Sequence, residues 1–189
     1  MAAGLGLLGR GHTTRALPLG LLHIAGAAIA GALLGGLIGG VGALLDLAQW
    51  RPWIIAAAAF MALVLALRRT PPRLGRQRQV PRRWSPTTSP SRVYLAWGMM
   101  LGFGVATPVF YTAFVLLVGA QLTAGPWVGM LSGALFGLTR QAMALIPVLR
   151  QYEPIRIMGL LETLRPTARR FNTALVIVGG LLLMIASKS

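Results

Sequence analysis

The sequence predicts an all-α, polytopic membrane helix bundle with five transmembrane helices, the N-terminus inside and the C-terminus outside. Hydrophobic residues make up 56% of the 189 residues and charged residues only 11%, whereas soluble domains average about 25% charged. Long apolar runs alternate with short polar turns. The chain has 18 basic and 3 acidic residues, and the basic ones gather at the ends of the apolar runs. That placement indicates membrane topology and argues against nucleic-acid binding.

Residues 1–16 are predicted to be a cytoplasmic N-terminal tail. A cleaved signal peptide is the alternative, but the apolar run that follows is long and rich in glycine, which favours a retained membrane helix. Residues 17–67 then form a transmembrane hairpin of two helices joined by a tight turn after Leu45. Trp50 and Trp53 lie at the start of the second helix, where tryptophan favours the membrane interface.

Residues 68–92 form a cytoplasmic loop that cannot enter hydrocarbon. The loop contains eight arginines, five prolines and no acidic residue. Each such charge costs about 2.5–3.5 kcal/mol at the bilayer centre, and a loop rich in arginine stays on the cytoplasmic side. We expect it to attract the anionic lipids of that leaflet, at about 1 kcal/mol per residue.

Residues 93–149 are predicted to form a second transmembrane hairpin, with helices over 93–121 and 126–149. The segment 150–170 mixes charged residues with a broad apolar surface, which is typical of an amphipathic helix lying at the interface. A last transmembrane helix occupies 171–189, with its apolar run ending near Ala186.

The charges support this topology at every loop. Fifteen arginines lie at ends predicted to be inside, whereas only Arg51 and Lys188 lie at ends predicted to be outside. The positive-inside rule therefore orients the chain, and helical spans indicate a multi-pass protein of the cytoplasmic (inner) membrane.

Two helices carry glycines at intervals of four residues. Small residues at this spacing let helix backbones approach closely in lipid and gain dispersion contacts. We therefore predict helix packing along these rows, within the chain or at a seam between two copies; a pathway lined by small residues is the alternative. The residues are Gly31, Gly35, Gly39, Gly129, Gly133 and Gly137.

The best candidate site lies in the third predicted helix. Pro108 cannot donate a hydrogen bond to the carbonyl of Gly104, so the helix must bend or break. Exposed backbone at that depth is tolerated only against protein or water. Thr107 and Tyr111 place hydroxyls beside the bend, which predicts substrate binding there; a purely structural kink is the alternative.

A second group of polar residues is predicted to share a layer of the bundle. Arg140 and Gln141 lie inside the fourth helix, and His23 lies at a comparable depth in the first. An intramembrane arginine indicates a functional site, although its side chain can instead extend to the nearby interface. If the three residues converge, they form a polar pocket suited to an anion; simple packing is the alternative for His23.

The run LGFGVATPVFYTAF, followed by GPWVGMLSGALFGLTRQAMALIPV, resembles the second half of the cytochrome c biogenesis transmembrane family of thiol–disulfide electron carriers. The lysine-exporter superfamily is broadly similar. The resemblance implies a scaffold of six helices in two inverted three-helix repeats, of which this chain lacks the first helix. It implies no redox activity here, because the chain has no cysteine.

The sequence thus predicts a membrane protein that is not an enzyme and has no cofactor or metal. It contains two histidines and three acidic residues, too few for a hydrolytic metal centre. A transporter-like or carrier-like bundle is the first hypothesis, because proline-interrupted helices mark transport sites. A non-catalytic subunit, packing within a larger membrane complex or against a second copy, is the alternative.

Overall fold

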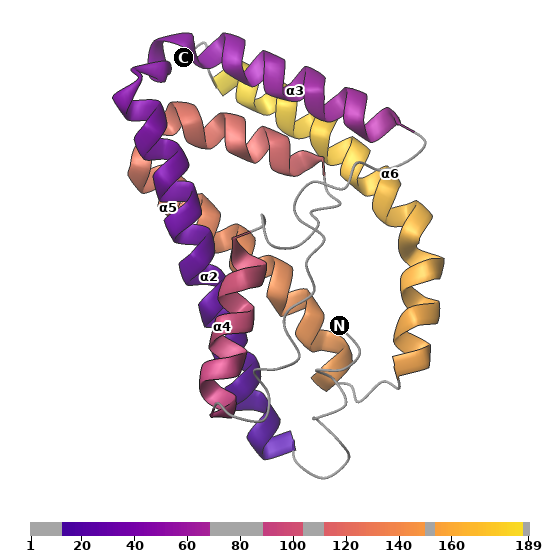
Figure 1. Ribbon diagram of the computed structural model, residues 1–189. Coiled ribbons are helices and arrows are strands. Elements are labelled where there is room, and N and C mark those ends of the chain that lie inside the picture. Colours follow the sequence, from indigo (N-terminus) through magenta and orange to yellow (C-terminus); the bar gives the residue numbers. More distant parts are fainter. Residues whose placement is uncertain (1–12, 69–88, 104–111, 150–153, 187–189) are drawn as a thin grey trace.

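The described chain is almost wholly helical (Figure 1). The computed structural model describes residues 13–68, 89–103, 112–149 and 154–186, and none of these lies in a β-strand. The predicted all-α class is therefore confirmed. The elements are α2 (Thr13–Leu44), the 3-10 helix η2 (Leu47–Trp50), α3 (Arg51–Leu67), α4 (Pro90–Gly102), α5 (Ala113–Leu149) and α6 (Pro154–Ala186).

Four stretches of helix are long and apolar enough to cross a membrane, as a multi-pass membrane protein requires. They cover Leu17–Leu44, Leu47–Leu67, Ala113–Ala142 and Pro166–Ala186. The helix predicted over 93–121 is not among them. Its first part is α4, whose 13 residues extend only about 20 Å at 1.5 Å per residue, less than the roughly 30 Å of hydrocarbon.

α5 contains a sharp break at Gly125. This glycine has φ 82° and ψ 173°, a conformation that side-chain-bearing residues rarely adopt. Pro126 follows and has no N–H to donate, which favours the start of a new helix. The turn predicted between residues 121 and 126 therefore lies here, and it divides α5 into a first part (113–124) and a second part (126–149).

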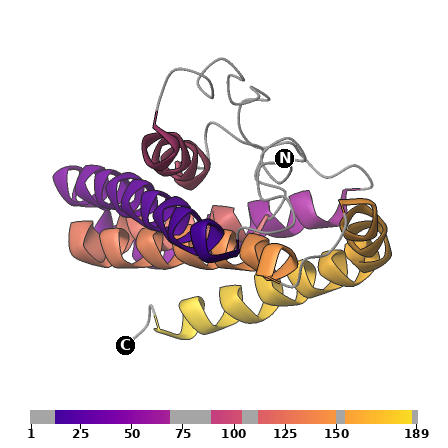
Figure 2. The same ribbon diagram turned by 90° about the horizontal axis from the view of Figure 1, so that it is seen from below.

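The helices form two groups that differ in direction (Figure 1). In one, α2 packs with α4 and with the second part of α5. In the other, α3 packs with the first part of α5 and with α6, around the buried side chains of Ala62, Leu116 and Val176. In Figure 2, α4 lies on one side of the pair formed by α2 and α5, and α6 lies on the other side.

The outer faces of these helices are apolar. Leu37 is 66% exposed and Trp127 is 80% exposed, which is unfavourable in water and favourable in lipid. Trp50, Trp53 and Trp127 all lie near the α2–α3 turn and the break at Gly125, which are adjacent in space. Exposed tryptophans at one end are typical of a membrane interface.

The last helix differs from its prediction. An interfacial segment over 150–170 and a separate helix from 171 were expected, but α6 runs continuously from Pro154 and contains Pro166. Its membrane-compatible part begins at Pro166. A proline inside a helix removes one backbone hydrogen bond and clashes with the preceding turn, which accounts for the bend of α6 in Figure 1.

Candidate functional site

α2 and the second part of α5 pack backbone against backbone. A Cβ added to Gly31 would lie under 3.0 Å from the carbonyl oxygen of Gly133, and a Cβ on Gly133 would meet the carbonyl oxygen of Gly31. The next turn repeats the relation: Gly35 and Gly129 face each other in the same reciprocal way. These close contacts supply dispersion attraction where lipid offers no hydrophobic gain.

The same antiparallel register extends in both directions. Gly39 lies against Gly125, and Gly137 lies against the backbone of Ala27. Each step of four residues along α2 is matched by four residues back along α5. All six glycines of the predicted packing rows therefore lie at this one interface within the chain.

One further step of four residues brings His23 to Gln141. The His23 Nε2 atom lies 3.1 Å from Gln141 Oε1, and Nδ1 lies 3.2 Å from the carbonyl oxygen of Tyr94 in α4. Gln141 is only 2% exposed. Three helices thus meet at His23, and the glycine register determines which polar residue of α5 it contacts.

The partner of His23 Nδ1 determines the direction of that bond. A carbonyl oxygen only accepts, so Nδ1 donates to the carbonyl of Tyr94. The contact between Nε2 and the Gln141 side chain joins α2 to α5.

The aromatic residues of α4 enclose this layer. The Tyr94 ring meets the His23 ring edge to face at 6.5 Å between centroids, and Trp97 follows at 5.7 Å from Tyr94. The Trp97 Nε1 atom is buried and has no hydrogen-bond partner among the described residues. α4 also packs on α2 through Gly98, where a Cβ would meet the His23 carbonyl.

Arg140 lies on the side of α5 that meets the end of α4. Its side chain is half-buried, and its Nη1 donates to the carbonyl oxygen of Leu101 at 3.1 Å. Leu101 is in the last turn of α4, where carbonyls lack partners within the helix. The positive guanidinium therefore lies at the negative end of the α4 dipole, a favourable arrangement.

The start of α5 is held by a residue from α6. The Asn172 side chain donates from Nδ2 to Thr112 Oγ1 at 2.8 Å and accepts at Oδ1 from the backbone N–H of Ala113 at 3.4 Å. Both Thr112 and Asn172 are buried. The bond to Oδ1 gives a partner to the backbone N–H of Ala113, one of the first N–H groups of α5, which have no partner within the helix.

The residues predicted to form the bend itself, Thr107, Pro108 and Tyr111, lie outside the described residues. The structure nevertheless shows that a helix ends at Gly102 and another begins at Ala113. These two helices differ in direction (Figure 1).

A further polar pair lies near the turn at Gly125. Gln121 Nε2 donates to Ser132 Oγ at 3.1 Å, across the two parts of α5. Ser132 Oγ donates in turn to the carbonyl of Gly129 at 3.2 Å. A Cβ on Gly35 would lie 3.0 Å from the Gln121 amide nitrogen, so this pair also depends on a glycine of α2.

Sequence reasoning missed Asn172 and Gln121. Each is a single amide within an apolar run, FNTALVIV and VGAQLTAG, and a buried amide in a membrane helix needs a partner. That signal could have identified both residues, but not their partners. Within the described ranges, no cluster of three or more His, Cys, Asp or Glu residues could hold a metal ion.

The fold and these contacts define a class: a multi-pass membrane helix bundle with buried polar contacts between its helices. Comparison with protein-family models, with curated proteins and with solved structures gave no match.

Proposed function

We propose that this protein is a carrier of the cytoplasmic (inner) membrane that binds a small anionic solute where α4 and α5 separate. In this proposal, α4 and the first part of α5 together make one interrupted span, which brings the number of spans to five. The N-terminus is then inside and the C-terminus outside. Arg140, Gln141 and His23 lie on the cytoplasmic side of the site.

One observation carries the proposal. The two helix ends that flank the proposed interruption, the end of α4 and the start of α5, each bond with a polar side chain from elsewhere in the bundle. Arg140 donates to Leu101 at the end of α4, and Asn172 bonds with Thr112 and Ala113 at the start of α5. Interrupted membrane helices are tolerated where they line a cavity. In transporters, such half-helix ends mark the substrate site.

The chemistry of Arg140 favours an anion. A guanidinium is always charged and carries five N–H donors, which match the oxygens of a carboxylate or phosphate. Its contact with the carbonyl oxygen of Leu101 places this charge at the end of α4.

The family resemblance supports the same reading at the level of scaffold. We propose a carrier scaffold like that of the cytochrome c biogenesis transmembrane family, with a proline-interrupted helix but without the redox cysteines. Neither electron transfer nor enzymatic catalysis is part of the proposal.

Proteoliposomes holding the purified chain test this function. Uptake of small radiolabelled carboxylates and phosphate esters would be compared for wild type, Arg140→Leu and Asn172→Leu, with empty liposomes as the control. We expect saturable uptake of at least one anion by the wild type and loss of uptake in both variants. Absence of uptake across the panel, from protein shown to be folded and inserted, would contradict the proposal.

A non-catalytic membrane subunit is the second candidate, and a specific observation favours it. His23 contacts Gln141, Gln121 contacts Ser132, and Thr112 contacts Asn172, so these polar groups are already satisfied within the chain. A partner protein would then pack against the exposed apolar faces of this bundle. Purification in mild detergent distinguishes the candidates, because a subunit retains a stoichiometric partner.

A further inference from the structure

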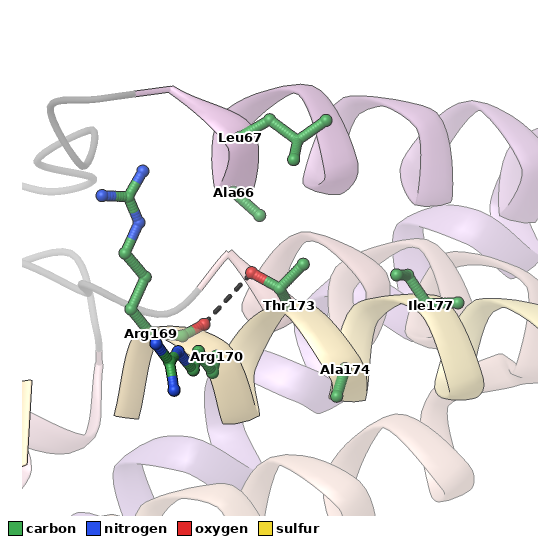
Figure 3. Close-up of a pocket in the computed structure, with 7 residues that line it drawn as sticks. All are labelled: Ala66, Leu67, Arg169, Arg170, Thr173, Ala174 and Ile177. Carbon is green, nitrogen blue, oxygen red and sulfur yellow. Dashed lines mark hydrogen bonds between the residues drawn. The ribbon is translucent and has the colours of Figure 1, made fainter. Parts of the chain in front are cut away.

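A groove lies between the C-terminal end of α3 and the middle of α6 (Figure 3). Its volume is about 400 Å³, and it is lined by Ala66, Leu67, Arg169, Arg170, Thr173, Ala174 and Ile177. The helices run antiparallel here, so the end of α3 meets the start of the membrane-compatible part of α6. The groove therefore lies at the basic end of both helices.

The lining divides into an apolar part and a charged part. Ala66, Leu67, Ala174 and Ile177 supply hydrocarbon walls, and Arg169 and Arg170 are the charged lining residues. The Arg169 side chain is directed towards α3, whereas the Arg170 side chain lies on the side of α6 away from α3 (Figure 3). Figure 3 shows Arg169 reaching towards the end of α3 while Ile177 lies at the other end of the groove. None of the seven lining residues is acidic.

Arg169 is held in place by α3. Its Nη2 donates to the carbonyl oxygen of Arg68 at 2.6 Å, and its own carbonyl accepts from Thr173 Oγ1 at 3.1 Å. The first bond links α6 to the end of α3, where a cation is favoured by the helix dipole. It uses one of the five N–H donors of the side chain and leaves the rest for an oxyanion.

The groove opens towards the outer surface of the helices. Leu67 is 66% exposed and Ile177 is 47% exposed, and both belong to helices that can cross a membrane. A ligand there would contact hydrocarbon walls and guanidinium groups together. A soluble anion uses only the second of these, whereas an amphiphile uses both.

We infer that this groove is a binding site for one anionic phospholipid, with the headgroup phosphate on Arg169, the charge of Arg170 nearby on the next residue, and an acyl chain along Ala174 and Ile177. Basic pockets between membrane helices on the cytoplasmic side are suited to phosphate headgroups. The site differs from general attraction of lipid to the arginine-rich loop at 68–92, because Arg169 is bonded to the end of α3 and an apolar wall lies beside it. It is independent of the proposed carrier function.

Native mass spectrometry of the full chain, released from detergent containing phosphatidylglycerol, phosphatidylcholine or free glycerol phosphate, tests the inference. The decisive variant is the pair Arg169→Gln with Arg170→Gln. The matched control, Arg73→Gln with Arg76→Gln, removes the same charge from the loop. We expect one retained phosphatidylglycerol on wild type and control, and about tenfold or greater loss on the groove pair, given about 1 kcal/mol per basic residue.

A second variant, Ala174→Phe, fills the apolar part without changing charge. We expect it to reduce phosphatidylglycerol retention while the thermal transition stays cooperative, which separates loss of the site from loss of the fold. Equal loss from the loop pair would assign the lipid to the loop. Retention of phosphatidylcholine equal to that of phosphatidylglycerol would also overturn the inference. The same holds if Ala174→Phe leaves phosphatidylglycerol retention unchanged, or if free glycerol phosphate binds as well as the lipid does.

Discussion

Gly35 and Gly129 face each other so closely that a Cβ on either would collide with the carbonyl oxygen of the other. The relation explains why the glycine rows of α2 and α5 must be in one register, and why that register also brings His23 to Gln141.

Replacing an interface glycine should destabilise the fold far more than replacing an exposed one. Gly133→Leu would force the α2 and α5 backbones apart, and overpacking costs about 1–3 kcal/mol or more. Gly40→Leu is the control, since a Cβ there meets nothing within 4 Å. Thermal unfolding in detergent measures both. Equal transition temperatures for the two variants would show that the interface is not as described.

The hydrogen bond between His23 and Gln141 should contribute modestly to stability. We expect a double-mutant cycle of His23→Leu and Gln141→Leu to give a coupling of about 0.6 kcal/mol, and no more than about 1.7, as for other bonds between membrane helices. Reversible unfolding in mixed micelles provides the free energies. Strictly additive effects of the two substitutions would mean that the bond does not form.

Loss of the Arg140 guanidinium should impair function or assembly more than loss of a charge at the helix end. Arg140→Leu removes the donor to Leu101, whereas Arg150→Leu, which lies outside the described residues, changes an expected interfacial charge. Arg140→Lys should restore only part of the activity, because an ammonium lacks the planar donor geometry. Uptake assays and yield of monodisperse protein measure these effects; similar behaviour of both leucine variants would contradict the role of Arg140.

The predicted orientation can be tested by single cysteines, because the chain has none of its own. A cysteine at Gln49, which is exposed in η2, should react with an impermeant maleimide added to intact cells. A cysteine at Ser85, in the basic loop, should react only after the membrane is permeabilised. The reverse pattern would invert the proposed topology.

Much of the architecture could be predicted because glycine spacing and charge carry strong physical constraints in a membrane. The rows at Gly31 and Gly133 indicated close packing, and the equal depths of His23 and Gln141 indicated a shared layer. The sequence did not reveal which rows pair, since that depends on three-dimensional register. It also did not predict the continuous α6, because the change from the mixed charged segment 150–170 to an apolar run was taken as a boundary at residue 171, although one helix can carry both.

The bend predicted at Pro108 lies outside the described residues. Arg140 and Asn172, which bond with the end of α4 and the start of α5, come from distant parts of the sequence, and these bonds were not predicted. Single-sequence patterns describe each helix by itself. The partners of a helix end are set only when the helices pack.

The turn at Leu47–Trp50 and the break at Gly125 have a mechanical consequence. Both connect the two helix groups, and they lie side by side at one corner of the molecule. Because α2 and the second part of α5 touch backbone to backbone, we expect that group to keep its internal geometry. A change in the angle between the two groups would then have to alter the backbone at this corner, where two of the connections between them lie close together.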